Sequence, residues 1–166
     1  VTDGLTGLYL HRYFELQLKR ELKSAFHIHK NLALVIYDID HFKKINDTYG
    51  HEFGNIVLKA IAKSLKDHSR KNNIIARYGG EEFCIIVPGM KRDHAIKYAE
   101  RLRNLVSFLE FKTDKGEIVK VKMSAGIVTI EDASLDSATD FIKSADLALY
   151  KSKNDGRDRI SVFNKS

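Results

Sequence analysis

The sequence is poor in cysteine, proline and tryptophan. Its 166 residues include one cysteine, Cys84, one proline, Pro88, and no tryptophan. A single cysteine excludes an internal disulfide framework and favours a reducing, cytoplasmic setting. Because Cys84 lies within an apolar run, we predict that it is a small buried core residue rather than a reactive thiol.

Long apolar runs are also absent. No stretch approaches the roughly 18 consecutive apolar residues typical of a membrane-spanning helix, so no direct membrane insertion is expected. The first residues do not form a signal-peptide pattern. The chain opens without methionine, at "VTDGLTGL", which suggests that an upstream part is missing.

What is present indicates one globular domain over 1–166. Apolar residues make up 43% of the chain and charged residues 30%, enough for a single substantial core. The net charge of +6 fits a polyanionic partner such as a nucleotide, a nucleic acid or an acidic membrane. The basic residues are spread over helical segments without interleaved aromatics, so we expect a solvated surface and no nucleic-acid partner.

Apolar spacing predicts alternating helices and strands. The expected helices are 12–26, 53–65, 95–109 and a fourth that apolar residues mark over 138–149 and that ends near Gly156. The expected strands are 32–39, 74–78, 83–87, 116–130, entered through a turn at Lys115-Gly116, and 159–163. This order, with one tight hairpin, predicts an α/β or α+β fold around a central mixed sheet.

Two acidic pairs mark the candidate site. Asp38 and Asp40 end a buried strand, and because alternate strand residues share a face, Ile39 should point away from them. Carboxylates so placed can bind Mg²⁺, a hard cation that takes oxygen ligands and often shares phosphates of the substrate. A plainer alternative is that the acids end the strand and cap the next helix, which we favour for Asp40.

The second pair, Glu81 and Glu82, follows Gly79-Gly80. The two glycines predict a two-residue hairpin turn with positive φ at both positions. Glycine also lets a ligand approach the backbone, whose N–H groups can hold phosphate. Adjacent carboxylates raise one another's pKa and favour neutralisation by a cation, which Glu81 opposite Asp38 would bind.

Five blocks of sequence together resemble the GGDEF family, the catalytic domains of diguanylate cyclases. They are "DGLTGL" at 3–8, "DIDHFKKINDTYGHEFGN" at 38–55, "RYGGEEF" at 77–83, "SAGI" at 124–127 and "ALYKSKNDGRD" at 148–158. The resemblance implies a palm-like nucleotidyl-cyclase fold with a ferredoxin-like βααββαβ core and a mainly antiparallel sheet. It also implies that two GTP condense to cyclic di-GMP, with release of two pyrophosphates, across a homodimer.

The resemblance also implies roles for individual residues. Two Mg²⁺ or Mn²⁺ ions per site would be held by Asp38, the backbone carbonyl of Ile39, Glu81 and Glu82, and Glu81 is the candidate for deprotonating the 3′-hydroxyl. The phosphates would contact Lys43, Lys153 and Arg157, as well as the backbone at Gly79 and Gly80. Lys43 and Glu82 are, with Glu81, the candidate catalytic residues. The remaining substrate-binding candidates are Asn46, His51 and Asn55. By itself, Lys153 could simply be a cation in the last turn of a helix.

Four departures from the family pattern have consequences. Asn55 stands where aspartate is usual, and its mixed donor and acceptor pattern predicts relaxed guanine selectivity and some use of ATP. At the place of RxxD, a product-inhibition site in many family members, Arg70 keeps the arginine but Asn73 replaces the acid, so we predict little inhibition by product. Leu10 and His11 alter the local turn, and Asp158, where Asn is usual, could pull on Arg157 electrostatically.

Two other classes of function remain open. The domain could be a weakly catalytic binding or regulatory module for GTP or a cyclic dinucleotide, which Asn55 and the broken RxxD favour. A basic nucleic-acid binder is the third and least favoured class. The family resemblance further implies an upstream sensory domain and a cytoplasmic location, with missing upstream segments able to tether the protein to the inner membrane.

Overall fold

A computed structural model describes residues 1–133 and 137–164. Its helices are α1 (His11–Ile28), α2 (Phe42–Tyr49), α3 (His51–Asp67), α4 (Arg92–Ser107) and α5 (Ala138–Asn154). Its strands are β1 (Tyr9–Leu10), β2 (Leu32–Ile39), β3 (Ile74–Arg77), β4 (Glu82–Pro88), β5 (Phe111–Lys112), β6 (Ile118–Val119), β7 (Met123–Thr129) and β8 (Ile160–Val162).

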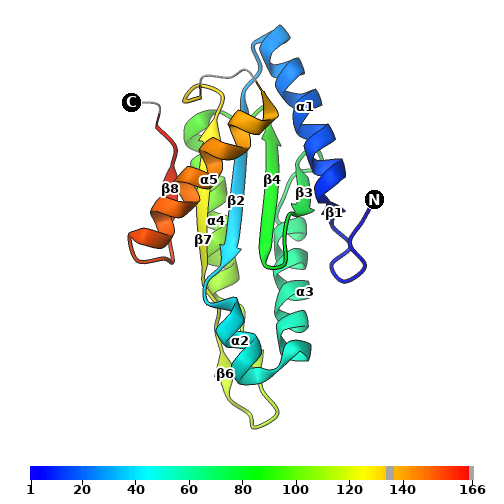
Figure 1. Ribbon diagram of the computed structural model, residues 1–166, viewed down its shortest axis with the longest axis vertical. Helices are drawn as coiled ribbons and strands as arrows, with labels where there is room; N and C mark the ends of the chain where they lie inside the picture. The colour runs from blue at the N-terminus through cyan, green and yellow to red at the C-terminus, as the bar shows by residue number, and fades with distance from the viewer. Residues whose placement is uncertain (134–136, 165–166) are drawn as a thin grey trace.

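The main sheet has six strands in the order β1-β3-β4-β2-β7-β8. The central strand β2 is antiparallel to both β4 and β7, while the two edge strands β1 and β8 pair in parallel with their neighbours. This mixed, mainly antiparallel sheet with helices on both faces confirms the predicted fold class (Figure 1).

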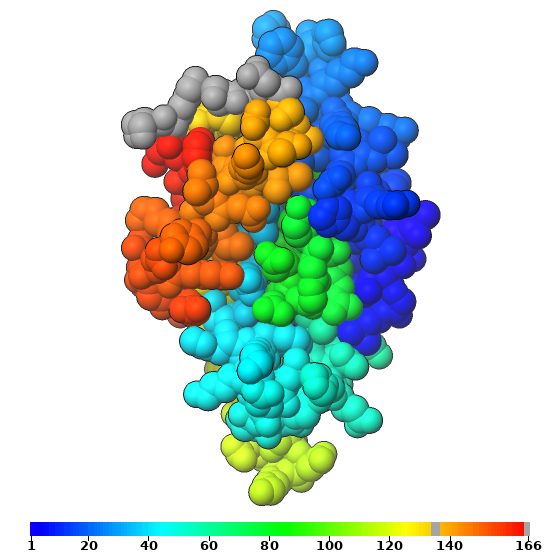
Figure 2. Space-filling view, in the orientation of Figure 1, coloured from blue at the N-terminus to red at the C-terminus, as the bar shows by residue number. Residues whose placement is uncertain are grey.

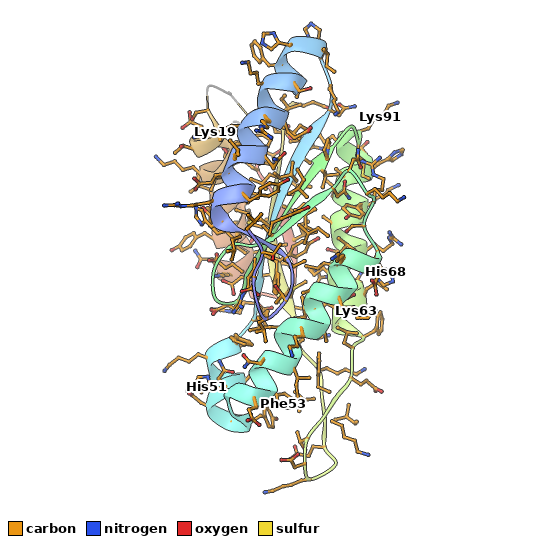
Figure 3. All side chains as sticks on the ribbon, turned by 90° about the vertical axis from the view of Figure 1, so that its right-hand side faces the viewer. Lys19, His51, Phe53, Lys63, His68 and Lys91 are labelled. Carbon is orange, nitrogen blue, oxygen red and sulfur yellow. The ribbon has the colours of Figure 1, made fainter. Side chains whose placement is uncertain are left out.

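The two faces of the sheet form separate cores because β2 and β4 are buried on both sides. Val35, Tyr37 and Ile39 contribute to the core under α3 and α4, whereas Leu34 and Ile36 contribute to the core under α1 and α5. Figure 3 shows α1, with Lys19, on one side of the sheet and α3, with Lys63 and His68, on the other. The buried position predicted for Cys84 is confirmed, in the second of these cores.

The predicted strand over 116–130 is wrong in its first half. The turn at Lys115-Gly116 is present, with Gly116 at φ +83°, but it joins β5 to β6 in a separate two-stranded sheet. Residues 120–122 belong to no strand, and β7 begins at Met123, which pairs with Ile39, the last residue of β2. The alternating sequence can form a strand, yet β2 offers no partner beyond Ile39. Within the described residues, no helix is long and apolar enough to cross a membrane.

Candidate functional site

The predicted acidic site lies where β2 ends, on the face covered by α5. Asp38 is 8% exposed, and the strand register places it between Glu82 of β4 and Ser124 of β7. The residue opposite Asp38 is therefore Glu82, and the expectation that Glu81 stands opposite is corrected by one position. As expected, the Ile39 side chain points into the other core, so only its backbone can serve this site.

Glu81 and Glu82 both have raised pKa values. Burial is the largest cause for each, and the negative charge of Asp38 adds to it, while Lys153 acts in the opposite direction. The Glu81 carbonyl accepts a hydrogen bond from the Ile39 N–H at 3.2 Å, which fastens the hairpin loop to the end of β2. Three carboxylates are thereby gathered at the end of β2, where burial and the negative charge of Asp38 disfavour ionisation of the two glutamates.

One cation already reaches this cluster. The Lys153 Nζ lies 2.6 Å from the Asp38 Oδ2, and the lysine comes from the last turn of α5, as predicted. One ammonium among three carboxylates leaves an excess of negative charge when all are ionised. A further cation would stabilise the ionised form.

These residues fit a magnesium site that is completed by substrate. Carboxylate oxygens are the ligands that Mg²⁺ prefers, and the charge of Asp38 adds to the effect of burial in raising the pKa values of Glu81 and Glu82. Among residues 1–133 and 137–164, no group of three or more His, Cys, Asp and Glu side chains is arranged to hold a metal by itself. Phosphate oxygens would have to complete the coordination shell, as they commonly do for Mg²⁺.

Asp40 has a different role from Asp38. Its Oδ1 accepts a hydrogen bond from the Ser124 hydroxyl at 2.6 Å, and its Oδ2 accepts one from the Asp158 N–H at 3.0 Å. Capping of the next helix by Asp40 is not observed, because α2 is preceded by His41 and has no side-chain cap. Asp40 instead joins β7 to the turn that follows α5.

The hairpin differs from the predicted two-residue turn. Four residues, 78–81, separate β3 from β4, and neither Gly79 nor Gly80 has a positive φ. A Cβ on Gly79 would lie 2.8 Å from the Glu82 Oε1, so this glycine makes room for the site's own carboxylate. A Cβ on Gly80 would meet nothing within 4 Å, which leaves open space beside the backbone there. Figure 2 shows the hairpin on the surface between α1 and α5.

The candidate base-binding and catalytic residues of α2 and α3 form a second group, next to the acidic cluster along the chain. The Lys43 side chain is 93% exposed, and its Nζ lies 3.9 Å from the Asp47 Oδ2. His51 and Asn55 are exposed on α3, and Figure 3 shows His51 at the α2 end of this helix. The Oδ1 of Asn46 is buried without a hydrogen-bond partner in the described chain, and it occupies the space that a Cβ on Gly54 would take.

Arg157 is presented by an unusual turn. Arg157 and Asp158 both adopt left-handed backbone conformations, with φ of 63° and 50°. The Asp158 carboxylate lies 2.6 Å from the Arg103 Nη1, so its expected pull on Arg157 is not what the geometry shows. Sequence reasoning missed Arg103, although a charged residue on the buried face of a predicted helix is a signal that it has a partner.

Arg70 and Asn73 are engaged with the protein itself. The Arg70 Nη2 donates to the Pro88 carbonyl at 2.8 Å, and the buried Asn73 donates through Nδ2 to the Tyr98 hydroxyl at 2.9 Å. The two side chains therefore have different partners, although both line a surface pocket between residues 2–9 and residues 66–75.

Comparison with known proteins agrees with this arrangement. The family model described as "Diguanylate cyclase, GGDEF domain" matches residues 1–159. Among curated proteins, the chain is 39% identical to "Diguanylate cyclase DgcP" of Pseudomonas aeruginosa, over 98% of this chain and 24% of that protein. It is 35% identical to "Probable diguanylate cyclase DgcC" of Escherichia coli K12, over 96% of this chain and 42% of that protein. The chain thus spans less than half of the length of these relatives.

Solved structures agree in the same way. The GGDEF domain of DgcB from Caulobacter crescentus, in complex with c-di-GMP, superposes with a TM-score of 0.91 at 33% identity, over 97% of this chain and 94% of that one. The active GGEEF domain of a diguanylate cyclase from Vibrio cholerae gives a TM-score of 0.87 at 28% identity, over 96% of this chain and 99% of that one. With its strand-end acids and its "RYGGEEF" hairpin, the chain belongs to the GGDEF family of diguanylate cyclase domains.

Proposed function

We propose that this domain condenses two molecules of GTP to cyclic di-GMP and releases two pyrophosphates. Each subunit of a homodimer would hold one GTP, and each 3′-hydroxyl would attack the α-phosphorus of the other nucleotide. The observation that carries the proposal is the convergence of Asp38, Glu81, Glu82 and Lys153 at the end of β2.

The chain's own residues would bind and orient the nucleotide. Two Mg²⁺ or Mn²⁺ ions, held by Asp38, the Ile39 carbonyl, Glu81 and Glu82, would supply positive charge for the attacking and leaving oxygens. Lys153 and Arg157 would hold the triphosphate, and Lys43 would reach it from α2. Glu81 would accept the proton of the 3′-hydroxyl, while the open space at Gly80 admits the nucleotide to the backbone.

The direct test measures pyrophosphate release from GTP in the presence of Mg²⁺. We expect release by the wild-type domain, loss of it on removal of the metal, and loss of it in Glu81→Ala. Glu110→Ala, at an exposed glutamate outside the site, is the matched control and should retain activity. Undiminished release by the Glu81→Ala variant would rule out the proposed site.

A regulatory binding module is the second candidate function. The observation that favours it is Asn55, which is exposed on α3 in the expected base site. This alternative predicts binding of GTP or of cyclic di-GMP without pyrophosphate release. Equilibrium binding measured on the same samples as the release assay therefore separates the two functions.

Base selectivity is the part of the proposal that Asn55 decides. Guanine presents two adjacent donors, and an amide can accept only one of them, whereas adenine offers a donor and an acceptor. Asn55 is exposed in the free domain, and once a bound base covers it a mismatched pair costs about 1–3 kcal/mol, so we expect some cyclic GMP-AMP or cyclic di-AMP from mixed nucleotides. Mass analysis of products from GTP, ATP and their mixture tests this, with Asn55→Asp as the matched variant expected to restore pure cyclic di-GMP. Pure cyclic di-GMP from the wild-type domain would contradict it.

We further propose that an upstream sensory domain controls dimerisation in the full protein. The longer curated relatives support this setting, because this chain covers 42% of one and 24% of another. The proposal includes a cytoplasmic site of action, where GTP is available, and tethering to the inner membrane through segments outside this chain.

A further inference from the structure

The turn that presents Arg157 is held from the far side of the sheet. Arg103, from α4, is 8% exposed and donates to the Asp158 Oδ1 at 2.6 Å. In Figure 1, α4 lies behind the sheet and α5, which leads into this turn, lies in front of it. The ion pair therefore connects two layers that the sheet separates.

Arg103 is itself fixed before it reaches Asp158. Its Nε and Nη2 donate to the two oxygens of Glu100, at 2.9 and 2.6 Å, in a bidentate pair along α4. A planar guanidinium held in this way has little rotational freedom left, so its Nη1 points in one direction. This Nη1 donates the hydrogen bond to the Asp158 carboxylate.

Asp158 is fastened at its backbone as well. Its N–H donates to the Asp40 Oδ2 at 3.0 Å, and the other oxygen of Asp40 accepts from the Ser124 hydroxyl at 2.6 Å. Left-handed conformations at two successive non-glycine residues are unfavourable and persist only where the surroundings hold them. Arg103 and Asp40 hold this turn from two directions.

Arg157, by contrast, is not engaged through its side chain. Its N–H donates to the Ser152 carbonyl at 2.9 Å, and its carbonyl accepts from the Arg159 Nε at 2.9 Å. Among the described residues its guanidinium makes no hydrogen bond or ion pair. The turn thus holds the Arg157 backbone and leaves its charged group to a ligand.

We propose that Arg103 is a positioning residue, which acts through Asp158 to hold Arg157 toward the nucleotide phosphates. This inference rests on the proposed function for the direction of Arg157. It also explains the change from the usual Asn to Asp158, since a carboxylate is the stronger partner for a buried guanidinium.

The first test measures coupling between two residues that do not touch. Arg103→Met keeps an unbranched stem in the core, and its effect is compared in the wild-type and Arg157→Ala backgrounds. In the wild-type background, we expect Arg103→Met to weaken binding of a non-hydrolysable GTP analogue about three- to tenfold. In the Arg157→Ala background, we expect it to cause no further loss of affinity. In turnover, the loss should appear in KM more than in kcat. Equal losses in both backgrounds, or none in either, would overturn the proposal.

Asp158 supplies the matched variants. Asp158→Ala should reproduce the loss seen in Arg103→Met, and the double variant should be no worse than the single ones. Asp158→Asn keeps an oxygen acceptor and should restore most of the affinity. Lys97→Ala, at an exposed lysine on the same helix, should leave affinity unchanged. Additive losses in the double variant would mean that Arg103 acts by another route.

A measurement without nucleotide separates this inference from the proposed function. Amide hydrogen exchange at Arg157 and Asp158 should become about tenfold or more faster in Arg103→Met, while the Gly89 N–H, bonded to the Asn31 carbonyl, stays protected. Faster exchange in a domain that does not bind GTP would support the role of Arg103 in holding the turn and would contradict the proposed cyclase function. Unchanged exchange at Arg157 and Asp158 would contradict the role of Arg103, whatever the activity of the domain.

Discussion

At the scale of single residues, Glu82 is a site carboxylate whose ionised form is disfavoured by its surroundings. It lies opposite Asp38 across two paired strands, and a Cβ on Gly79 would clash with its carboxylate, at 2.8 Å from the Oε1. Burial, followed by the charge of Asp38, raises the pKa of Glu82 above its ordinary value of 4.5. The arrangement is therefore strained electrostatically until a cation or a proton arrives.

Glu82→Gln should stabilise the folded domain near neutral pH. Because the raised pKa means that the folded state holds this proton more tightly than the unfolded chain, stability falls as the pH rises from about 4.5 through the raised pKa. The variant removes this loss, so its advantage over wild type should shrink as the pH is lowered toward about 4. Thermal unfolding of both proteins across this pH range measures it.

Magnesium provides the control for this prediction. Mg²⁺ added together with a non-hydrolysable GTP analogue, whose phosphates complete the coordination shell, should stabilise the wild-type domain more than Glu82→Gln, because the variant offers one carboxylate fewer. Glu110→Gln, at an exposed glutamate elsewhere, should respond to the metal like wild type. A Glu82→Gln domain that is less stable than wild type near neutral pH would contradict this account.

Product binding is a second prediction at this scale. Asn73 is buried, is bonded to Tyr98 and offers no carboxylate, so the exposed Arg70 would have to bind cyclic di-GMP without an acidic partner. We expect weak binding and little inhibition of turnover by added product. Calorimetric titration with cyclic di-GMP checks it, and submicromolar affinity that Arg70→Ala removes would be the contrary result.

The acids of the site could be found from sequence, and their contacts could not. Asp38 was identifiable because a carboxylate at the end of an apolar run needs a partner. Its partner Lys153 lies 115 positions away in the chain, and only the family resemblance linked the two. The pairing of Asp38 with Glu82 rather than Glu81 depends on strand register. Arg103 was missed because its partner follows another helix.

At the scale of elements, the continuous apolar runs were the most reliable guide. The predicted strand 32–39 coincides with β2, because a strand buried on both faces is apolar at successive positions. The helices α1 and α3 extend only slightly beyond the apolar positions that predicted them. The break between β6 and β7 was not predictable, since it depends on where β2 ends.

The contact between α5 and β7 should be sensitive to one methyl group. A Cβ on Gly126 would lie 2.3 Å from both the Ala145 carbonyl oxygen and the Leu149 nitrogen, which are helix backbone atoms and cannot rotate away. Gly126→Ala should lower the free energy of unfolding by about 1–3 kcal/mol or more. Displacement of α5 should also move Lys153 from Asp38 and weaken GTP binding.

Urea denaturation measures the stability change, and Gly4→Ala is the matched control. A Cβ on Gly4 would meet nothing within 4 Å, so the control should have nearly wild-type stability. Wild-type stability in Gly126→Ala would show that α5 can shift away from the sheet without cost.

At the scale of the whole molecule, one domain provides one set of site residues at one end of β2. The proposed reaction joins two nucleotides, so turnover should depend on an encounter between two domains. We expect pyrophosphate release per domain to fall on dilution, while GTP binding per domain stays constant. Full activity in samples that sedimentation shows to be monomeric would exclude the two-subunit reaction.

The burial of Cys84 has a practical consequence for such experiments. Burial raises the pKa of its thiol well above the ordinary value, and the sequence contains no other cysteine. Maleimide reagents should therefore leave the native protein unlabelled. A cysteine introduced at Lys115, in the turn between β5 and β6, would then be the single reactive position, and a fluorophore there could report the approach of two domains through energy transfer.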